Sequence, residues 1–162
     1  MTGQAASPTH ESTDAVMARV LDDRPDVVAA LAVAHTAAWA AVDPVLLEVC
    51  RLRVAMLLGC DDELAMRTPA ALDAGLEENV VVELASWPTS SRFDARARAC
   101  LALTEQFVID VATLDETLTD DVTSHLGAAG LVDFTHALLV VEQRLRLRLV
   151  WQRLLEPAEV GS

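Results

Sequence analysis

Apolar residues recur at steps of three and four along most of this chain, the spacing typical of amphipathic helices. The clearest case follows Asp43, which fits the N-cap position, and Pro44, which fits the first helical position. An apolar stripe then continues to Gly59, which either ends this helix or lets a neighbouring backbone approach closely. An earlier apolar run, beginning at Pro25, predicts a first helix over residues 25–40.

Further helices are expected after Gly59. Thr68 and Pro69 repeat the cap-plus-proline signal, and Trp87-Pro88 should stop the helix that precedes it. The pattern predicts helices at 69–75, at 76–87, from Ser91 or Asp94 to 110, at 120–125 and at 131–155. The stretch RLRLRL at 144–149 alternates like a strand, but its apolar flanks without turn residues favour helix. Its three arginines are expected to pair with acids of neighbouring helices or subunits.

This order predicts an all-α fold, a compact helical bundle. The chain has 162 residues, 52% of them apolar, with only six Gly and six Pro, which favours long helices over many short strands. Residues 1–23 are polar and rich in Ser and Thr, and we interpret them as a flexible acidic tail. Residues 24–157 are expected to form a single helical domain, and residues 158–162 a C-terminal tail.

Charge narrows the range of partners. The formal net charge is −13 and all twelve basic residues are Arg, so nucleic acid and anionic membrane surfaces should repel the chain. The apolar run Val27–Val42 is too short and Ala-rich to span a bilayer, which favours a buried or subunit-facing helix. Three cysteines without framework spacing, and a start without signal-peptide features, indicate a reducing cytoplasm.

The segment LLEVCRLRVAMLLGCDDELAMRTPAALDAGLEENVVVELASW carries a family resemblance. Glu48 and Cys60 lie twelve residues apart, and Ala71 and Gly75 follow at four-residue steps. Together with the order of the helices, these positions resemble the alkylhydroperoxidase D-like, carboxymuconolactone decarboxylase family over roughly residues 42–155. The resemblance implies an all-α bundle of the alkylhydroperoxidase D-like type, assembled as trimers or hexamers.

The redox branch of that family carries a Glu and then a Cys-x-x-Cys-x-x-x-His motif, in which the second Cys attacks peroxide. The Glu and His relay protons, and the first Cys resolves the sulfenic acid. Here only Glu48 and Cys60 match, because Glu63 replaces the attacking Cys and Arg67 replaces the His. The decarboxylase branch reads Glu-Leu-x-x-His at this place, and Arg67 departs from that pattern too.

Cys60 therefore has two interpretations. It is either a small buried apolar residue or a reactive thiol, which would need a lowered pKa. The acids at positions 61–63 oppose the thiolate, although Arg67 could offset them by folding back. Glu48, Glu63 and Arg67 are expected to converge on one pocket, where Arg67 would form an ion pair or clamp a carboxylate ligand but could not relay protons.

Three functions follow as hypotheses. The first is a peroxidase-like antioxidant oxidoreductase with Cys60 and Glu48 as catalytic residues. The second is a non-redox protein of the same fold, used for ligand binding or assembly, with Glu63 and Arg67 as binding residues. The third is a decarboxylase- or isomerase-like enzyme acting on a small acidic metabolite held by Arg67. No His, Cys, Asp and Glu residues show metal-ligand spacing, so no metal or cofactor is expected.

Overall fold

The computed structural model describes residues 11–155, and within this range the chain is built from helices without a strand, which confirms the all-α prediction. In chain order they are α1 (Thr13–Val20), α2 (Pro25–Ala41), α3 (Pro44–Leu58), α4 (Asp61–Ala65), α5 (Pro69–Asp73), α6 (Glu78–Val82), the 3-10 turn η1 (Glu83–Ser86), α7 (Ala95–Asp110), the 3-10 turn η2 (Val111–Thr113) and α8 (Glu116–Leu155).

The predicted helix ends are confirmed where a capping signal was present. The Asp43 side chain accepts a backbone N–H bond at the start of α3, and Pro44 occupies the first turn. Asp94 caps α7 in the same way, which decides between the two starts that the sequence left open. Gly59 ends α3 in the left-handed conformation, with φ of 68°.

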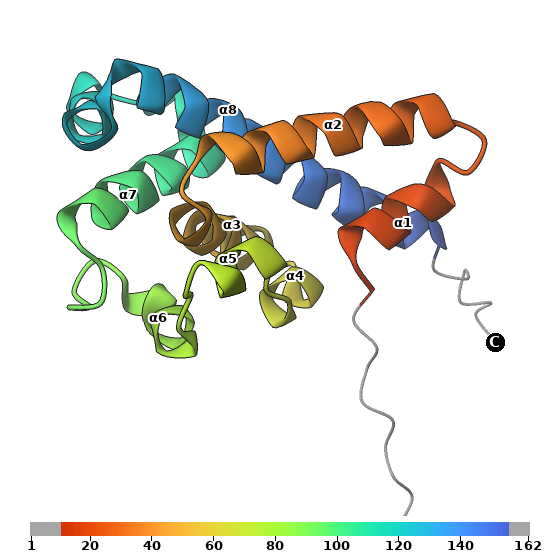
Figure 1. Ribbon diagram of the computed structural model, residues 1–162, viewed down its shortest axis with the longest axis horizontal. Helices are drawn as coiled ribbons and strands as arrows, with labels where there is room; N and C mark the ends of the chain where they lie inside the picture. Colours follow the sequence, from red (N-terminus) through yellow and green to blue (C-terminus); the bar gives the residue numbers. More distant parts are fainter. Residues whose placement is uncertain (1–10, 156–162) are drawn as a thin grey trace, which may run out of the picture.

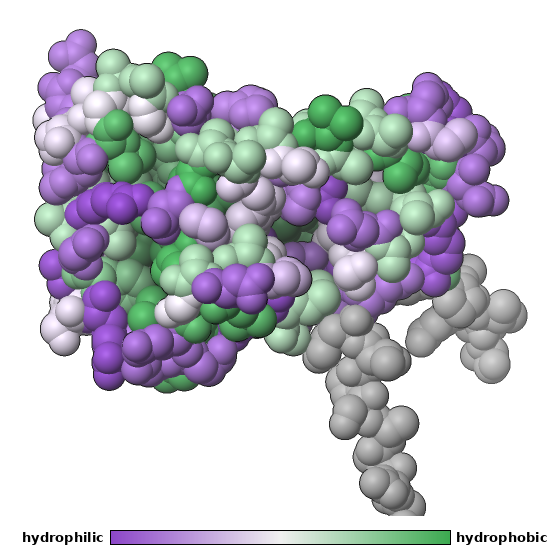
Figure 2. Space-filling view, in the orientation of Figure 1, coloured by the Kyte–Doolittle hydropathy of each residue, from purple (hydrophilic) through white to green (hydrophobic). Residues whose placement is uncertain are grey.

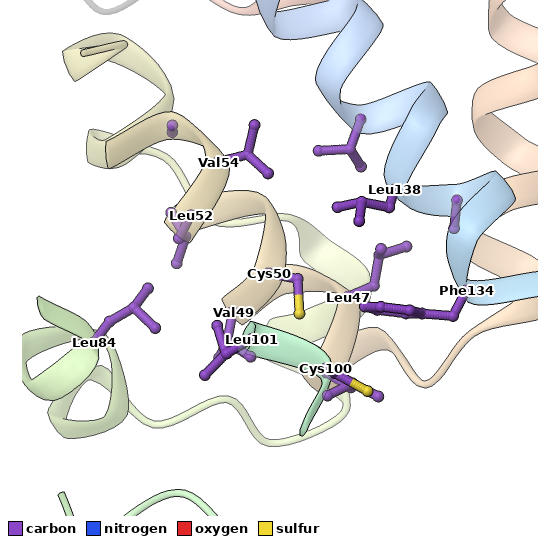
Figure 3. Close-up of a cluster of buried hydrophobic side chains, with 14 of the residues drawn as sticks. Leu47, Val49, Cys50, Leu52, Val54, Leu84, Cys100, Leu101, Phe134 and Leu138 are labelled. Atoms are coloured by element: carbon purple, nitrogen blue, oxygen red, sulfur yellow. The ribbon is translucent and has the colours of Figure 1, made fainter. Parts of the chain in front are cut away.

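Helix α3 is the central element of the core. It packs against α7 and α8, and α2 and α1 lie along α8 (Figure 1). Its side chains meet those of α7, α8 and η1 in one apolar cluster (Figure 3). Fully buried members include Leu47, Cys50, Leu52, Val54, Leu84, Leu101, Phe134 and Leu138. A central helix buried on several sides explains why charged residues of α3 must find partners inside the protein.

Helix α8 consists of two helical parts joined at Gly127, whose φ of 74° and ψ of 168° are not helical. The expected short and long closing helices are these two parts. Within residues 11–155, α8 is also the one helix long and apolar enough to cross a membrane. Helices of soluble proteins can have the same length and composition, and α8 packs against α1, α2, α3 and α7.

The predicted N-terminal tail needs correction, because residues 13–20 form helix α1 against α8. Ser12 accepts a backbone N–H bond as N-cap, while Val16 and Met17 are buried. Two adjacent apolar residues in a polar segment are a weak signal for a helix. Packing against α8 buries these two side chains and thereby stabilises the helix. Residues 1–10 and 156–162 lie outside the described residues.

Helix α2 is largely exposed in this single chain. It contains one charged residue, Asp26, and one buried residue, Ala38, while Val33 is 70% exposed. Figure 2 shows apolar and small residues along the edge of the molecule that α2 forms in Figure 1. Of the two expectations for this run, burial within the chain is therefore wrong, and a subunit-facing helix stays a prediction.

Candidate functional site

An arginine that the sequence analysis did not select, Arg51, lies between the two expected site carboxylates. Its Nε and Nη2 donate to the two oxygens of Glu48 at 2.9 and 2.7 Å, and its Nη1 donates to Glu63 Oε2 at 2.5 Å. Glu48 and Arg51 are three residues apart on α3 and thus share one helix face. The start of α4 brings Glu63 to the other side of the guanidinium.

The remaining polar atoms of this group are also satisfied. Arg51 donates to the carbonyl oxygens of Glu63 at 3.2 Å and Met66 at 3.0 Å, so all five of its N–H groups have acceptors. Thr68 donates its backbone N–H and its hydroxyl to Glu48, both at 3.1 Å. Burial opposes the charge of Arg51, but Glu48 and Glu63 outweigh burial and raise the pKa of the guanidinium.

A second arginine, Arg148 of α8, joins this network and is fully buried. Its Nη2 lies 2.5 Å from Asp62, and its Nη1 lies 3.5 Å from Glu63 and 3.2 Å from the Thr13 hydroxyl. Thr13 in turn donates to Glu63. The network therefore connects α1 and α8 to α4. Asp62 and Glu63, which are adjacent in sequence, both form ion pairs with Arg148.

A cavity of about 410 Å³ borders this network. Helices α1, α2, α3, α4 and α8 and the segment 66–70 contribute its lining. Figure 2 shows a hollow between α2, α1 and the short helices α4 and α5. The aromatic and charged side chains of the lining include His35, Trp39, Arg51, Glu63, Arg67 and Arg144. The lining thus combines an aromatic residue with charged groups of both signs.

Cys60 does not belong to that lining. It is 2% exposed and precedes α4, and burial raises the pKa of its thiol. Cys50 and Cys100 are also buried free thiols, and burial raises the pKa of Cys100 to about 12. The structure therefore brings Glu48 and Glu63 together through Arg51, whereas Cys60 belongs to the buried apolar core.

Arg67 lies at the cavity but has other partners than expected. Its Nη2 and Nε bind Glu78 at 2.7 and 3.2 Å, and its Nη1 donates to the carbonyls of Leu64 and Met66. The expected ion pair of Arg67 with Glu48 or Glu63 is thus wrong, since Arg51 takes that place. The signal that could have identified Arg51 is the i,i+3 spacing from Glu48 inside an apolar helix.

His35 also lines the cavity, although it was not among the site residues predicted from the sequence. The Trp39 Nε1–H donates to His35 Nε2 at 2.8 Å, which places the proton of the neutral ring on Nδ1. Burial, reinforced by the charge of Arg144, lowers the pKa of His35. The ring is therefore neutral near pH 7. Among residues 11–155, no group of His, Cys, Asp and Glu side chains is arranged to hold a metal ion.

Comparison with known proteins agrees with this fold. The model of the carboxymuconolactone decarboxylase family matches residues 25–106, slightly more than half of the chain. The chain belongs to this family. A solved structure from Agrobacterium tumefaciens has a similar fold, and that protein is described as one of unknown function and a candidate antioxidant defence protein AhpD. The two structures share 16% sequence identity at a TM-score of 0.71, over 86% of this chain and 97% of that one.

The resemblance drawn from Glu48, Cys60, Ala71 and Gly75 is thereby confirmed at the level of family and fold. At 16% identity, the structural likeness extends to the fold alone. None of the curated proteins compared matches the chain.

Proposed function

We propose that this family member binds a small molecule in the cavity and does so without a redox-active thiol. The observation that carries the proposal is the replacement of the attacking-Cys position by Glu63, whose carboxylate is bound to Arg51 and Thr13. A carboxylate held by two donors cannot attack peroxide as a thiolate does. The retained Cys60 lies outside the cavity with a raised pKa, which disfavours the nucleophilic thiolate.

The competing hypothesis, peroxidase-like antioxidant activity, predicts a different kinetic result. Under the present proposal, peroxide consumption in the presence of the protein and a dithiol donor should equal the rate with the donor alone. Cys60→Ser should leave that rate unchanged. Cys50→Ser, which alters another buried thiol, is the matched control. A protein-dependent rate that Cys60→Ser abolishes and Cys50→Ser preserves would refute the proposal.

Binding can be measured separately from turnover. Small carboxylic acids and their amides should quench or shift the fluorescence of Trp39, which lines the cavity, and Trp39→Phe should remove that signal. NMR of the same samples should recover the ligand unchanged. Conversion that is lost in His35→Gln would instead favour the decarboxylase- or isomerase-like hypothesis, because the neutral imidazole of His35 lines the cavity and could accept a proton from a ligand.

We also propose that copies of the chain associate through α2, as trimers or hexamers, and that the protein acts in the cytoplasm. The exposed apolar surface of α2 supports the association, since monomeric proteins rarely leave such a helix face in water.

A further inference from the structure

We infer that Arg144 is the carboxylate-binding residue of the cavity and that Asp14 of α1 competes with the ligand for it. The inference rests on the proposed function and adds a ligand class, a small carboxylic acid with an apolar body. It also gives α1 a role, because the competing carboxylate is carried by that helix.

The first observation is the environment of Arg144. Its side chain is 7% exposed, and it lines the cavity from α8. Its Nη2 is paired with the Asp14 carboxylate, and its Nη1 lies 3.5 Å from the sulfur of Met17. Both partners belong to α1. A buried guanidinium needs a counter-charge, so Asp14 can leave only if another anion replaces it.

The second observation is the contrast with the other cavity arginines. Arg51 has every N–H group bound, mainly by the buried carboxylates of Glu48 and Glu63. Arg67 has two backbone carbonyls as well as Glu78. Displacing the partners of Arg51 would strand buried carboxylates. The Glu78 side chain is 67% exposed, so Arg67 is held mainly by its two backbone carbonyl bonds.

Arg144 differs from Arg51 because the side chain of its carboxylate partner, Asp14, is 75% exposed. It differs from Arg67 because no backbone carbonyl of residues 11–155 accepts a bond from it. An exposed carboxylate loses little when it returns to water. Exchange of Asp14 for a ligand carboxylate also leaves the charge of the site unchanged. Arg144 is therefore the cavity cation that a carboxylate reaches at the lowest cost.

The apolar part of the ligand follows from the remaining lining. Val141 and Leu145 lie on α8 on either side of Arg144 in sequence, and Trp39 contributes an aromatic ring from α2. The Trp39 Nε1–H is already bound by His35, so the ring presents an apolar surface. The cavity volume of about 410 Å³ is large enough for a small carboxylic acid with an apolar body.

Helix α1 should stay folded on the protein when Asp14 is displaced. Val16 and Met17 remain buried, and Thr13 keeps its bonds with Glu63 and Arg148. The competition therefore concerns one side chain, and it can be tested without removing the helix.

The test compares the binding of benzoate, phenylacetate and hexanoate with that of their amides, by isothermal titration calorimetry of the full chain. Asp14→Asn should tighten carboxylate binding roughly fivefold and leave amide binding unchanged, because the competing charge is gone. The matched control is Glu11→Gln, which removes a negative charge from the same segment but touches Arg19 rather than Arg144. It should change neither affinity.

Arg144→Gln should abolish the preference for acids over amides, whereas Arg67→Gln should keep it. Circular dichroism checks that both variants fold. If Arg144→Gln does not fold, the affinities of Asp14→Asn still decide the test. Equal carboxylate affinity in Asp14→Asn and the unchanged protein, or loss of the preference in Arg67→Gln, overturns the inference while binding itself stands. Failure of every acid and amide to bind would count against the proposed function as well.

Discussion

The bond pattern around Arg51 indicates how a charged cluster is tolerated inside an apolar bundle. Glu48, Arg51 and Glu63 are each at most 7% exposed, and two carboxylates so placed would repel one another without the cation between them. Well-paired buried charges are not strongly stabilising in themselves, but removing one partner strands the others. The cluster therefore acts as a positional constraint on α3 and α4.

Arg51→Ala is expected to lower the free energy of unfolding by about 3–5 kcal/mol, because it leaves two buried carboxylates without a counter-charge. Urea denaturation measures the loss. Arg92→Ala serves as control, since its pair with Glu83 is 45% and 40% exposed and should contribute about 1 kcal/mol at most. Equal losses in the two variants would contradict a special role for the Arg51 cluster.

His35 predicts a pH effect at the same scale. Burial lowers its pKa below the ordinary 6.5, so the unfolded chain binds its proton more readily than the folded one. This contribution to stability is complete above pH 6.5 and is lost as the pH falls through the folded-state pKa. His35→Gln retains an acceptor for Trp39 but does not titrate. The stability difference between the two proteins, measured by urea denaturation from pH 8 to 5, should shift in favour of His35→Gln as the pH falls; a constant difference would contradict the effect.

At the scale of the element, the ends of α3 follow from single residues. Asp43 and Pro44 define its start, and Gly59 ends it with φ of 68°, a conformation that residues with a Cβ rarely adopt. The end matters because the chain turns there into Cys60 and α4, which carries Asp62 and Glu63 to the arginines.

Gly59→Ala is expected to destabilise the protein by about 1–2 kcal/mol through backbone strain alone, since a Cβ there meets no atom within 4 Å. Gly59→Asn is the matched comparison, because Asn tolerates the left-handed region better than Ala does. Thermal denaturation should therefore rank the proteins Gly, Asn, Ala in falling stability. An Ala variant as stable as the Asn variant would show that the φ value is not the cause.

On the scale of the whole molecule, the dominant feature is the exposed apolar helix α2, lying on α8 with its outer face uncovered (Figures 1 and 2). The chain carries a net charge of −13, so association must bring together surfaces poor in acids. Helix α2, with Asp26 as its single charged residue, meets that condition.

Val33→Asp is expected to reduce the mass of the particle in solution, measured by sedimentation or light scattering, because it places a charge in the proposed contact. Val82→Asp is the control: Val82 is 74% exposed, compared with 70% for Val33, but lies on α6. A monomeric unchanged protein, or equal effects of the two variants, would contradict association through α2.

The sequence by itself determined the helices with strong local signals, the family, and the loss of the family's Cys and His at positions 63 and 67. Capping bonds and apolar periodicity act between residues a few positions apart, so they can be recognised in the chain alone. Only the tertiary structure decided that Arg51 rather than Arg67 neutralises Glu48 and Glu63, and that α1 is a helix. Those outcomes depend on which surfaces of α4, α1 and α8 meet, since burial determines where a charge must find a partner and where a weak helix is stabilised.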